Sequence, residues 1–451
     1  MIERVVEIPS HPSKAGCVAA GIRGLEVVGD PLVLDLGRCS QQGFSIGKMP
    51  IKSHRGNANF VGDTPHARRG RILGLVEEFQ SRCADILRGS CAHRYTVYTQ
   101  SAEVYGVYTV GGFGMARIWK RIGIGVLIYF VALFTVAGML VGFGHITQPK
   151  ALKSVTDPFS QMDLSGLPPI TRYKSRDGAA LSYRLYEGGD AQVAVLIHGS
   201  AGSSKDMHRM AEALLQRGVT VYVPDLRGHG ANYPHGDISY LGQLDDDIAD
   251  FMKAVHPQYK NAQWTLVGFS SGGGFALRIA GSDLGSEFDR FVFLSPYLRY
   301  NAPTVRSASP GEKASPEHNA WYSVSIKRII GLSIFDFFGI HRFDGLPVLA
   351  FPVPTDIEST TATYSFRLEE NFQPRSNYRA DIQAIKKPAQ VFVGGQDELF
   401  LPEKFAEVFD KVRSDIPVTI VPGMGHSDMI TKPEPITVVV NTFPKSYNRG
   451  R

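Results

Sequence analysis

Ser270 is the residue of this chain whose surroundings point most clearly to chemistry. It stands in a G-x-S-x-G pattern, with Gly268 two residues before it and Gly272 two residues after it. An apolar run leads into the pattern and a stretch with helical spacing follows, so a strand should turn sharply into a helix here. Glycines are needed on both sides because side chains would clash across the turn. The turn exposes the Ser270 hydroxyl, which predicts a nucleophilic serine.

Two later loops supply the groups that a serine nucleophile requires. Asp397 and His426 each follow an apolar run typical of a short buried strand. We expect His426 to take the serine proton as a general base, and Asp397 to orient the imidazole and stabilise its protonated form. Glu398 and Asp428 lie close enough in the sequence to compete with Asp397 for this role.

Hydrogen-bond donors for the developing oxyanion are expected from two loops. The apolar run 193–197 predicts a buried strand, and the glycine-containing loop 198–202 follows it, before a helix expected from about Lys205 to Gln216. The backbone N–H groups of Ser200 and Ser271 would together hold the negative oxygen that forms during attack.

The order of these segments predicts an α/β fold. From residue 178 onward, strand-like and helix-like segments alternate. Such alternation is typical of a mostly parallel sheet with helices on both faces. Ser270, Asp397 and His426 all follow the carboxyl ends of predicted strands, and open parallel sheets place their active sites at that edge.

The chain resembles the α/β-hydrolase superfamily, and within it the branch of monoacylglycerol lipases, lysophospholipases and serine aminopeptidase-like enzymes. Five motifs in family order carry the resemblance across about residues 165–445: the His-Gly pair at 198–199, the turn 225–230, the serine elbow, and the glycine-rich loops that hold Asp397 and His426. The resemblance implies a Ser270–Asp397–His426 triad, an acyl-enzyme that water hydrolyses, and no cofactor. It does not imply a substrate, because this branch acts on many esters and amides.

Neither a metal site nor a nucleic-acid site is expected. His198 and His229 resemble family positions that shape loops, and no H-x-x-x-H or HExxH pattern or carboxylate cluster accompanies them. From Met115 onward the chain has 35 basic and 33 acidic residues, so it lacks the field that attracts an anionic polymer.

An insertion at about residues 298–387 should form a cap over the nucleophile. Its start, from Ser307 to Asn319, is polar and rich in turn formers, whereas residues 329–338 are apolar and aromatic. Part of this apolar stretch must pack inside the cap. An apolar cap favours an ester with a hydrophobic acyl group over a sugar or a charged peptide.

Residues 122–144 have the length and composition of a transmembrane helix. They include no charged residue, and 23 residues at about 1.5 Å each span about 34 Å, against about 30 Å for a hydrocarbon core. Arg117, Lys120 and Arg121 lie on the amino side, which predicts an inside amino terminus and a catalytic domain on the non-cytoplasmic face, periplasmic or extracellular. A cleaved signal peptide is the alternative, but its apolar run is usually shorter and no A-x-A site follows.

Residues 1–114 show no sustained hydrophobic period and contain all 4 cysteines. One interpretation is a disordered or loosely folded cytoplasmic extension. A metal site at Cys83, Cys91 and His93 is disfavoured because the spacing fits no ordinary zinc motif. Our preferred hypothesis is that translation begins at Met115, which basic residues and the apolar run follow directly, so that 1–114 is an over-extended gene start.

The predicted organisation has four parts. Residues 1–114 form a poorly organised extension, 115–145 a membrane anchor with a short basic flank, 146–170 a proline-containing linker, and 171–445 an α/β-hydrolase domain that includes the cap at 298–387.

The sequence thus predicts a membrane-anchored serine hydrolase that cleaves carboxylic esters, with a lipase- or lysophospholipase-like preference. An aminopeptidase or amidase of the same fold is an alternative that needs an anionic group for a free amine, with candidates at Glu312, Glu317, Glu369 and Glu370. An acyltransferase is another, because it needs only an alcohol that outcompetes water. The alternative from a different class is a non-catalytic binding module.

Overall fold

The computed structural model describes residues 4–5, 98–99, 113–149, 152–306, 321–353 and 360–444. It divides into two compact units, one ending at Phe130 and one running from Val131 to the carboxyl end. In the first, β1 (Arg4–Val5) pairs antiparallel with β2 (Tyr98–Thr99). Apart from Arg4–Val5, Tyr98–Thr99 and the first residues of the helix that begins at Phe113, residues 1–114 lie outside the described ranges, and so do the four cysteines. The hypothesis that translation begins at Met115 remains a prediction.

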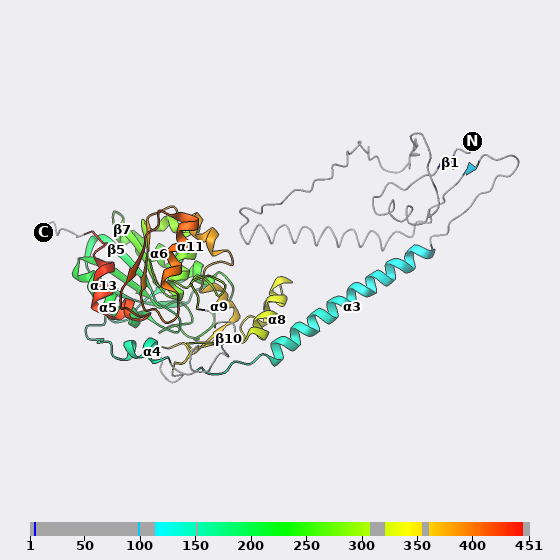
Figure 1. The fold of residues 1–451 in the computed structure, drawn as a ribbon, viewed down its shortest axis with the longest axis horizontal. Coiled ribbons are helices and arrows are strands. Elements are labelled where there is room, and N and C mark those ends of the chain that lie inside the picture. The colour runs from blue at the N-terminus through cyan, green and yellow to red at the C-terminus, as the bar shows by residue number, and fades with distance from the viewer. Residues whose placement is uncertain are drawn as a thin grey trace. The chain divides into compact units, whose positions relative to one another are not determined.

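An eight-stranded sheet forms the centre of the second unit (Figure 1). Its strand order is β13-β12-β8-β7-β5-β6-β4-β3, and all neighbours are parallel except β6–β4 and β4–β3. The expected mostly parallel α/β-hydrolase sheet is therefore confirmed. The strands are β3 (Thr171–Lys174), β4 (Ala180–Tyr186), β5 (Gly189–Ile197), β6 (Val219–Pro224), β7 (Gln263–Phe269), β8 (Arg290–Leu294), β12 (Ala389–Gly394) and β13 (Val418–Val421).

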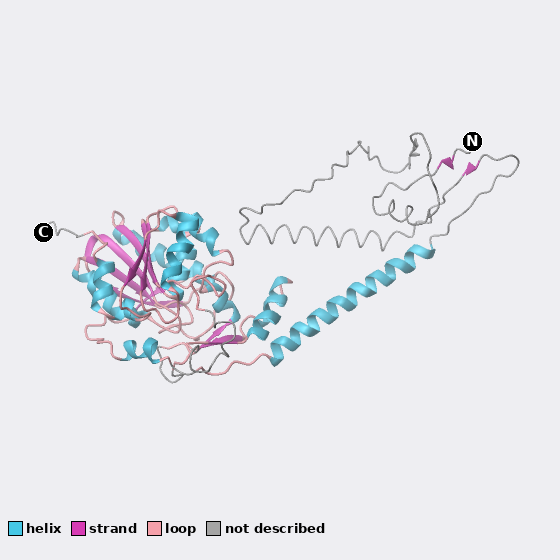
Figure 2. Ribbon diagram, viewed as in Figure 1, coloured by secondary structure: helices cyan, strands magenta, loops and turns pink. Residues whose placement is uncertain are grey.

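Helices cover both faces of this sheet, as Figure 2 shows. Alternate residues of β5 enter different cores: Val195 lies in the core with α6, α7 and α11, and Leu196 in the core with α5 and α13. Burial on both faces explains why the central strands are continuous apolar runs. The helices are α5 (His208–Gln216), α6 (Gln243–Val255), α7 (Ser271–Ala280), α10 (Tyr378–Ala384), α11 (Pro402–Arg413), α12 (Asp428–Thr431) and α13 (Pro433–Val440).

Short 3-10 turns separate several of these elements. The helix expected from about Lys205 begins as the 3-10 turn η1 (Ser204–Met207) and becomes α-helical only at α5. A capping box explains this start, because Ser203 and Asp206 bind each other's backbone N–H groups. The other 3-10 turns are η2 (His256–Tyr259), η3 (Asp283–Glu287) and η4 (His341–Phe343).

The insertion after β8 contains helices and a small sheet of its own. Strands β9, β10 and β11 pair antiparallel in the order β11-β10-β9. The bounds are β9 (Ser323–Val324), α8 (Ile326–Phe337), β10 (Pro347–Ala350), β11 (Thr363–Ser365) and α9 (Phe366–Asn371). The polar stretch expected at its start, 307–319, lies outside the described residues.

Part of the expected linker is packed onto the domain. Residues Lys153–Ser160 form α4, and the Val155 side chain is only 1% exposed. The Ser427 hydroxyl donates to the carbonyl of Val155 at 2.8 Å. We expected a linker here because prolines recur through residues 146–170, and one of them, Pro158, lies inside the helix itself.

One long helix, α3 (Phe113–Phe143), precedes the eight-stranded sheet in the chain. Within it, Trp119–Phe143 is long and apolar enough to cross a membrane.

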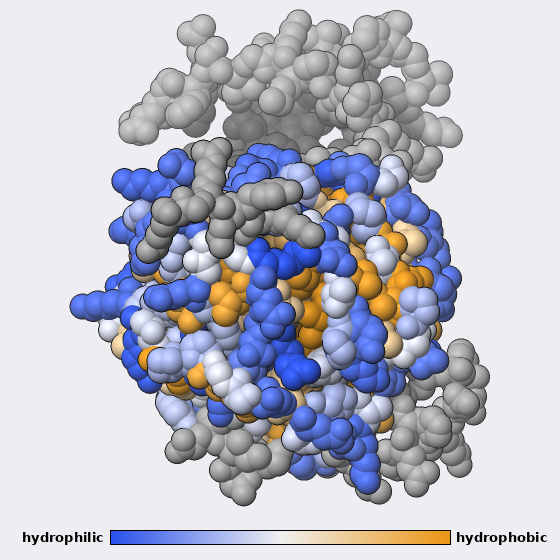
Figure 3. Space-filling model, turned by 90° about the vertical axis from the view of Figure 1, so that its left-hand side faces the viewer, coloured by the Kyte–Doolittle hydropathy of each residue, from blue (hydrophilic) through white to orange (hydrophobic). Residues whose placement is uncertain are grey.

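The surface of the second unit is mixed on the face drawn in Figure 3, where hydrophobic residues lie in patches between hydrophilic ones. Such a mixture is ordinary for a surface that faces water.

Candidate active site

The backbone at Ser270 has the sharp turn that the flanking glycines predict. Strand β7 ends at Phe269, helix α7 begins at Ser271, and Ser270 between them has φ 55° and ψ −120°. A Cβ on Gly268 would lie 2.2 Å from the carbonyl oxygen of Gly272, so a side chain there cannot fit. The positive φ of Ser270 costs about 1–3 kcal/mol in a residue other than glycine, and backbone strain of this kind clusters at functional sites.

The structure brings Ser270, His426 and Asp397 together in one hydrogen-bonded chain. Nε2 of His426 lies 3.0 Å from the Ser270 hydroxyl oxygen, and its Nδ1 lies 2.8 Å from Oδ2 of Asp397. All three residues are buried. In this arrangement one imidazole nitrogen can accept the serine proton while the other donates to the carboxylate.

Backbone groups fix the Asp397 carboxylate. Its second oxygen, Oδ1, accepts from the N–H groups of Leu399 at 2.9 Å and Phe400 at 3.0 Å. Burial alone would raise the pKa of Asp397, but the charge and hydrogen bond of His426 and the Phe400 N–H hold this pKa below its usual value. The carboxylate is therefore ionised and ready to stabilise a protonated imidazole.

The two competing carboxylates have other partners. Glu398 accepts from the backbone N–H of His426 at 2.8 Å, and Asp428 accepts from the backbone N–H of Gly425 at 2.8 Å. Both therefore shape the loop that carries the imidazole. Within the described part of the chain, Asp397 is the carboxylate that contacts the His426 ring.

The two expected oxyanion donors lie on neighbouring loops. The side-chain oxygens of Ser200 and Ser271 are 2.5 Å apart. A Cβ on Gly199 would lie 3.2 Å from Cβ of Ser270, so the loop after β5 closely approaches the serine. Among the described residues, neither the Ser200 nor the Ser271 backbone N–H has a protein acceptor. The Ser271 N–H belongs to the first turn of α7, where helix donors are free.

A tyrosine from the insertion holds the loop that carries Ser200, one of the two expected oxyanion donors, and the sequence analysis did not predict this contact. The hydroxyl of Tyr364, on β11, accepts from the backbone N–H of Ala201 at 2.7 Å. The same hydroxyl lies 2.6 Å from Nε2 of His229. Nδ1 of His229 faces the Arg227 carbonyl at 3.2 Å and must carry the proton, so Nε2 accepts from Tyr364. Burial and the nearby His198 lower the pKa of His229 well below its usual value, so the ring is neutral.

A second bond from the insertion supports the same loop. The backbone N–H of Thr361 donates to the Ala201 carbonyl at 3.1 Å. Both polar groups of the Ala201 backbone are thus held, and this residue adopts the left-handed φ of 58°. No local pattern signals these contacts, because Ala201 and Tyr364 are 163 positions apart in the sequence. His198 is likewise a loop anchor, with Nδ1 against the Gly199 carbonyl and Nε2 accepting from the Leu226 N–H.

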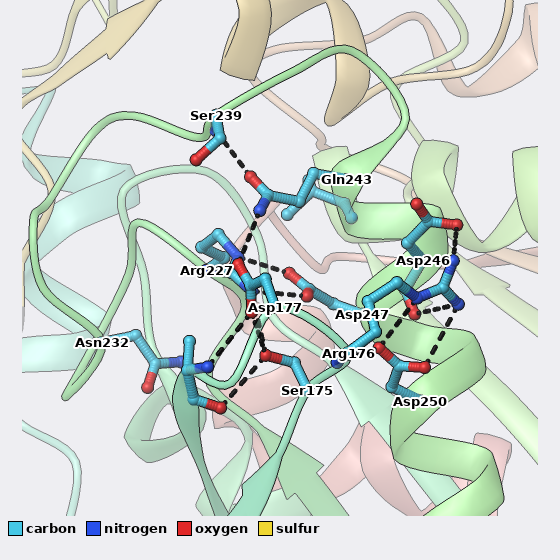
Figure 4. Close-up of polar contacts among 12 residues, drawn as sticks. Ser175, Arg176, Asp177, Arg227, Asn232, Ser239, Gln243, Asp246, Asp247 and Asp250 are labelled. Carbon is cyan, nitrogen blue, oxygen red and sulfur yellow. Dashed lines mark hydrogen bonds and ion pairs between the residues drawn. The ribbon is translucent and has the colours of Figure 1, made fainter.

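The turn that carries His229 is held by ion pairs, drawn in Figure 4. Arg227 pairs with Asp247 at 2.8 Å and with Asp177 at 3.1 Å. A cavity of about 510 Å³ borders this network, and Arg172 and Arg367 also line it. It is separate from the serine site, because Ser270, Asp397 and His426 are not among its lining residues.

Aromatic rings enclose the imidazole. The ring of Phe269 lies 4.9 Å and that of Phe400 5.2 Å from the His426 ring, centroid to centroid. Tyr297 stacks on Phe400 at 6.3 Å, and its backbone N–H donates to the Ser270 carbonyl at 2.9 Å. An apolar wall of this kind lowers the local dielectric and strengthens the polar contacts inside it.

One group of potential metal ligands occurs in the described residues. It consists of Asp336, His341 and Asp344, in the insertion. Nδ1 of His341 lies 2.9 Å from Oδ1 of Asp336 and 3.0 Å from Oδ2 of Asp344, so both carboxylates face the same ring nitrogen. None of the serine-site residues belongs to this group.

Comparisons with known proteins agree with the fold. A family model described as serine aminopeptidase, S33, matches residues 190–327. The sn-1-specific diacylglycerol lipase ABHD11 of Danio rerio is 26% identical over 145 residues, covering 32% of this chain and 43% of that protein. An uncharacterised protein of Mycobacterium tuberculosis, Rv2715, is 30% identical over 129 residues, covering 28% of this chain and 35% of that protein. The chain thus spans less than half the length of these curated relatives.

Among solved structures, the chain is similar to a soluble variant of monoglyceride lipase from Saccharomyces cerevisiae, at 17% identity and a TM-score of 0.49, covering 62% of this chain and 95% of that one. It is also similar to a monoacylglycerol lipase from Paleococcus ferrophilus, at 18% identity and a TM-score of 0.42, covering 58% of this chain and 97% of that one.

Proposed function

We propose that this chain, which belongs to the α/β-hydrolase superfamily by its sheet and its family-model match, is a serine hydrolase that cleaves carboxylic esters. One observation carries the proposal. The hydrogen-bonded chain from Ser270 through His426 to Asp397, at 3.0 and 2.8 Å, connects a hydroxyl on a strained turn to a general base and an ionised carboxylate. This arrangement is suited to nucleophilic catalysis.

The chemistry follows from the positions of these groups. The Ser270 oxygen attacks the ester carbonyl while its proton passes to Nε2 of His426. The carbonyl oxygen becomes negative and accepts from the Ser200 and Ser271 N–H groups. The imidazolium, stabilised by Asp397, then gives its proton to the departing alcohol. Water attacks the acyl-enzyme by the same route, which releases the acid and restores Ser270.

The proposed substrate is an ester with a hydrophobic acyl group, taken from or near a membrane. A relative that matches part of this chain is named as a diacylglycerol lipase, and the aromatic walls around His426 suit an apolar substrate. The helix Trp119–Phe143 would anchor the protein in the bilayer. The basic residues before it favour an inside amino terminus, with the hydrolase domain on the non-cytoplasmic face.

An aminopeptidase or amidase is the second candidate, and Glu369 is the observation that favours it. Burial and the charge of Glu369 raise the pKa of Tyr297, and the backbone N–H of Tyr297 donates to the Ser270 carbonyl. Burial and the charge of Glu370 raise the pKa of Glu369 to about 8. A substrate ammonium would relieve that unfavourable environment. Glu370 is less suited because it pairs with Arg299 at 3.2 Å, and Glu312 and Glu317 lie outside the described residues.

The test uses the full chain in detergent with p-nitrophenyl esters of increasing acyl length and with aminoacyl p-nitroanilides. We expect ester cleavage, labelling by a serine-reactive fluorophosphonate, and loss of both in Ser270→Ala. Ser271→Ala is the matched control, because it keeps the backbone N–H and should retain most activity. Cleavage of the anilides alone, abolished by Glu369→Gln, would favour the aminopeptidase. A folded wild-type protein that neither labels nor cleaves would favour a binding module.

A further inference from the structure

Three side chains with metal-binding atoms meet in the insertion, away from the serine site. Asp336 belongs to the last turn of α8, His341 begins η4, and Asp344 follows η4 directly. One potential ligand atom from each lies within 4.8 Å of the other two. Their spacing, D-x-x-x-x-H-x-x-D, matches no standard metal motif, so no site was expected here from the sequence.

The single Nδ1 proton of His341 cannot satisfy both carboxylates. A hydrogen bond joins Nδ1 to Oδ2 of Asp344 at 3.0 Å. The same nitrogen lies 2.9 Å from Oδ1 of Asp336, but that oxygen is buried and has no hydrogen-bond partner among the described residues. An N–H group donates along one direction, so the second oxygen faces the nitrogen without a proton between them.

Asp344 supplies a further unsatisfied oxygen. Its side chain is only 3% exposed, and its Oδ1 has no hydrogen-bond partner in the described part of the chain. Burial raises the pKa of Asp344, the His341 hydrogen bond opposes this shift, and the charge of Asp336 adds to it. A buried acceptor without a partner is unfavourable unless another group binds it. The two carboxylates therefore present negative charge that one imidazole proton does not compensate.

The basic side chains of the described residues do not supply the missing charge. Arg367 acts electrostatically on Asp344, but its guanidinium forms an ion pair with Asp237 at 2.6 Å. Among the ion pairs of the described residues, the partner of both Asp336 and Asp344 is His341. The site thus lacks a lysine or arginine that would make a cation unnecessary.

The distances within the group fit neighbouring ligands of one metal ion. Two ligand atoms at about 2.1 Å from an ion lie about 3.0 Å apart at right angles and about 3.4 Å apart in a tetrahedron. Nδ1 of His341 lies 2.9 and 3.0 Å from the two carboxylate oxygens. An ion bound there would take the place of the Nδ1 proton, and the neutral ring would carry its proton on Nε2.

We propose that Asp336, His341 and Asp344 form a binding site for a divalent metal ion of the Zn²⁺ type. An imidazole nitrogen with two carboxylate oxygens suits such an ion. Ca²⁺ is less suited because it takes about six to eight oxygen ligands. A water molecule would complete a tetrahedral set. The site is independent of the proposed ester hydrolysis, since no residue of the serine site belongs to it.

The expected role of the ion is to stabilise the insertion. It would join the end of α8 to the turn that follows η4. That turn is also bound to α9, because the backbone N–H of Arg367 donates to the Asp344 carbonyl at 3.1 Å. Helix α9 begins directly after β11, which carries Tyr364. The ion would thus connect α8 with the segment that contacts the loop of Ser200, without entering the chemistry at Ser270.

The test measures Zn²⁺ binding by isothermal titration calorimetry to the full chain in detergent, after treatment with a chelator. The four native cysteines are replaced by serine because thiolates also bind Zn²⁺. Asp344→Asn and His341→Gln each remove one ligand, and the matched control is Asp410→Asn, an exposed carboxylate on α11. His341 is 42% exposed, so His341→Gln should fold even if the buried Asp344→Asn does not. Cooperative thermal unfolding verifies that each variant is folded.

We expect one Zn²⁺ ion per chain, bound at least about tenfold more weakly by both ligand variants and unchanged in Asp410→Asn. Zn²⁺ should also raise the Tm of the chain that retains all three ligands, because an ion that binds only the folded state stabilises it. Absence of binding to that chain, or an affinity that neither Asp344→Asn nor His341→Gln changes, would overturn the site. Binding of Ca²⁺ in place of Zn²⁺ would overturn the assigned class of ion.

Discussion

At the scale of single residues, two neighbouring carboxylates contact different parts of His426. Asp397 contacts the His426 ring, and Glu398 holds the His426 backbone. Both contacts are 2.8 Å long, but only the first acts on the nitrogen opposite the one that faces Ser270. The chemical role is therefore expected from Asp397, and a positioning role from Glu398.

Substitutions of these two residues should separate the roles. Asp397→Asn should lower kcat about 10⁴-fold, because the amide cannot stabilise an imidazolium and favours the wrong tautomer. Glu398→Gln keeps an acceptor for the His426 N–H and should cost less than tenfold. Ester hydrolysis by both purified variants measures the difference. A larger loss in Glu398→Gln than in Asp397→Asn would assign the acid to Glu398.

The same carboxyl should make stability depend on pH in the acid range. The pKa of Asp397 is lower in the folded protein than its ordinary value of 3.8, so the folded state favours the ionised form. Its contribution is fully present above about pH 3.8 and is lost as the pH falls through the lower folded pKa. We therefore expect the difference in Tm between wild type and Asp397→Asn to narrow below pH 3.8. A constant difference down to pH 2 would contradict this.

Tyr364 should act on the rate through the oxyanion loop. Tyr364→Phe leaves the Ala201 N–H without its acceptor, a loss of about 1–3 kcal/mol for a buried donor. Looser placement of the Ser200 N–H should lower kcat about 10- to 100-fold with little change in KM. That loss is smaller than the roughly 10²- to 10³-fold loss that follows outright removal of an oxyanion donor.

The matched control for this substitution is Tyr378→Phe. The Tyr378 hydroxyl is buried and has no hydrogen-bond partner in the described part of the chain, so its removal should leave kcat unchanged. If the Tyr364→Phe variant keeps the wild-type kcat and only its Tm falls, Tyr364 contributes to stability and not to catalysis.

At the scale of elements, the sequence predicted the parts that local patterns encode. The strands β5, β7 and β12 are continuous apolar runs because both of their faces are buried, and α7 and α11 have clear helical spacing. The small sheet of the insertion was not predicted, since its strands are only 2 to 4 residues long. The contact of Tyr364 with Ala201 was not predicted either, because the two residues are 163 positions apart and meet only when the chain folds.

Helix α4 lies within the predicted linker, and we expect it to support the loop that carries His426. Val155 is buried, and its carbonyl accepts from Ser427, the residue after His426. Val155→Asp would bury an unpaired charge and should lower Tm by several degrees and reduce activity. The matched control is Ser154→Asp on the exposed side of α4. Thermal unfolding of both variants tests this, and equal Tm values would make α4 a dispensable linker.

At the scale of the whole molecule, packing contacts lead from the end of α3 through the insertion to the loop that carries Ser200. The end of α3 packs on α8 through Gly331, and the insertion that contains α8 holds the oxyanion loop through Tyr364. Each contact joins segments far apart in the sequence, so neither is visible in a local pattern. If α3 lies in a bilayer, the insertion and the oxyanion loop are positioned with respect to that bilayer as well.

The orientation of the proposed anchor is the last prediction, and it rests on the charges that flank the apolar helix. Arg117, Lys120 and Arg121 on the amino side should keep that side inside, so that protease added to intact cells digests the hydrolase domain. Lys120→Gln with Arg121→Gln should leave a larger fraction of the domain protected, because two of the three retaining charges are gone. Lys153→Gln, beyond the other end of the helix, should instead leave the native orientation unchanged or strengthen it. A native domain that is protected until the membrane is permeabilised would reverse the assignment and place ester hydrolysis on the cytoplasmic face.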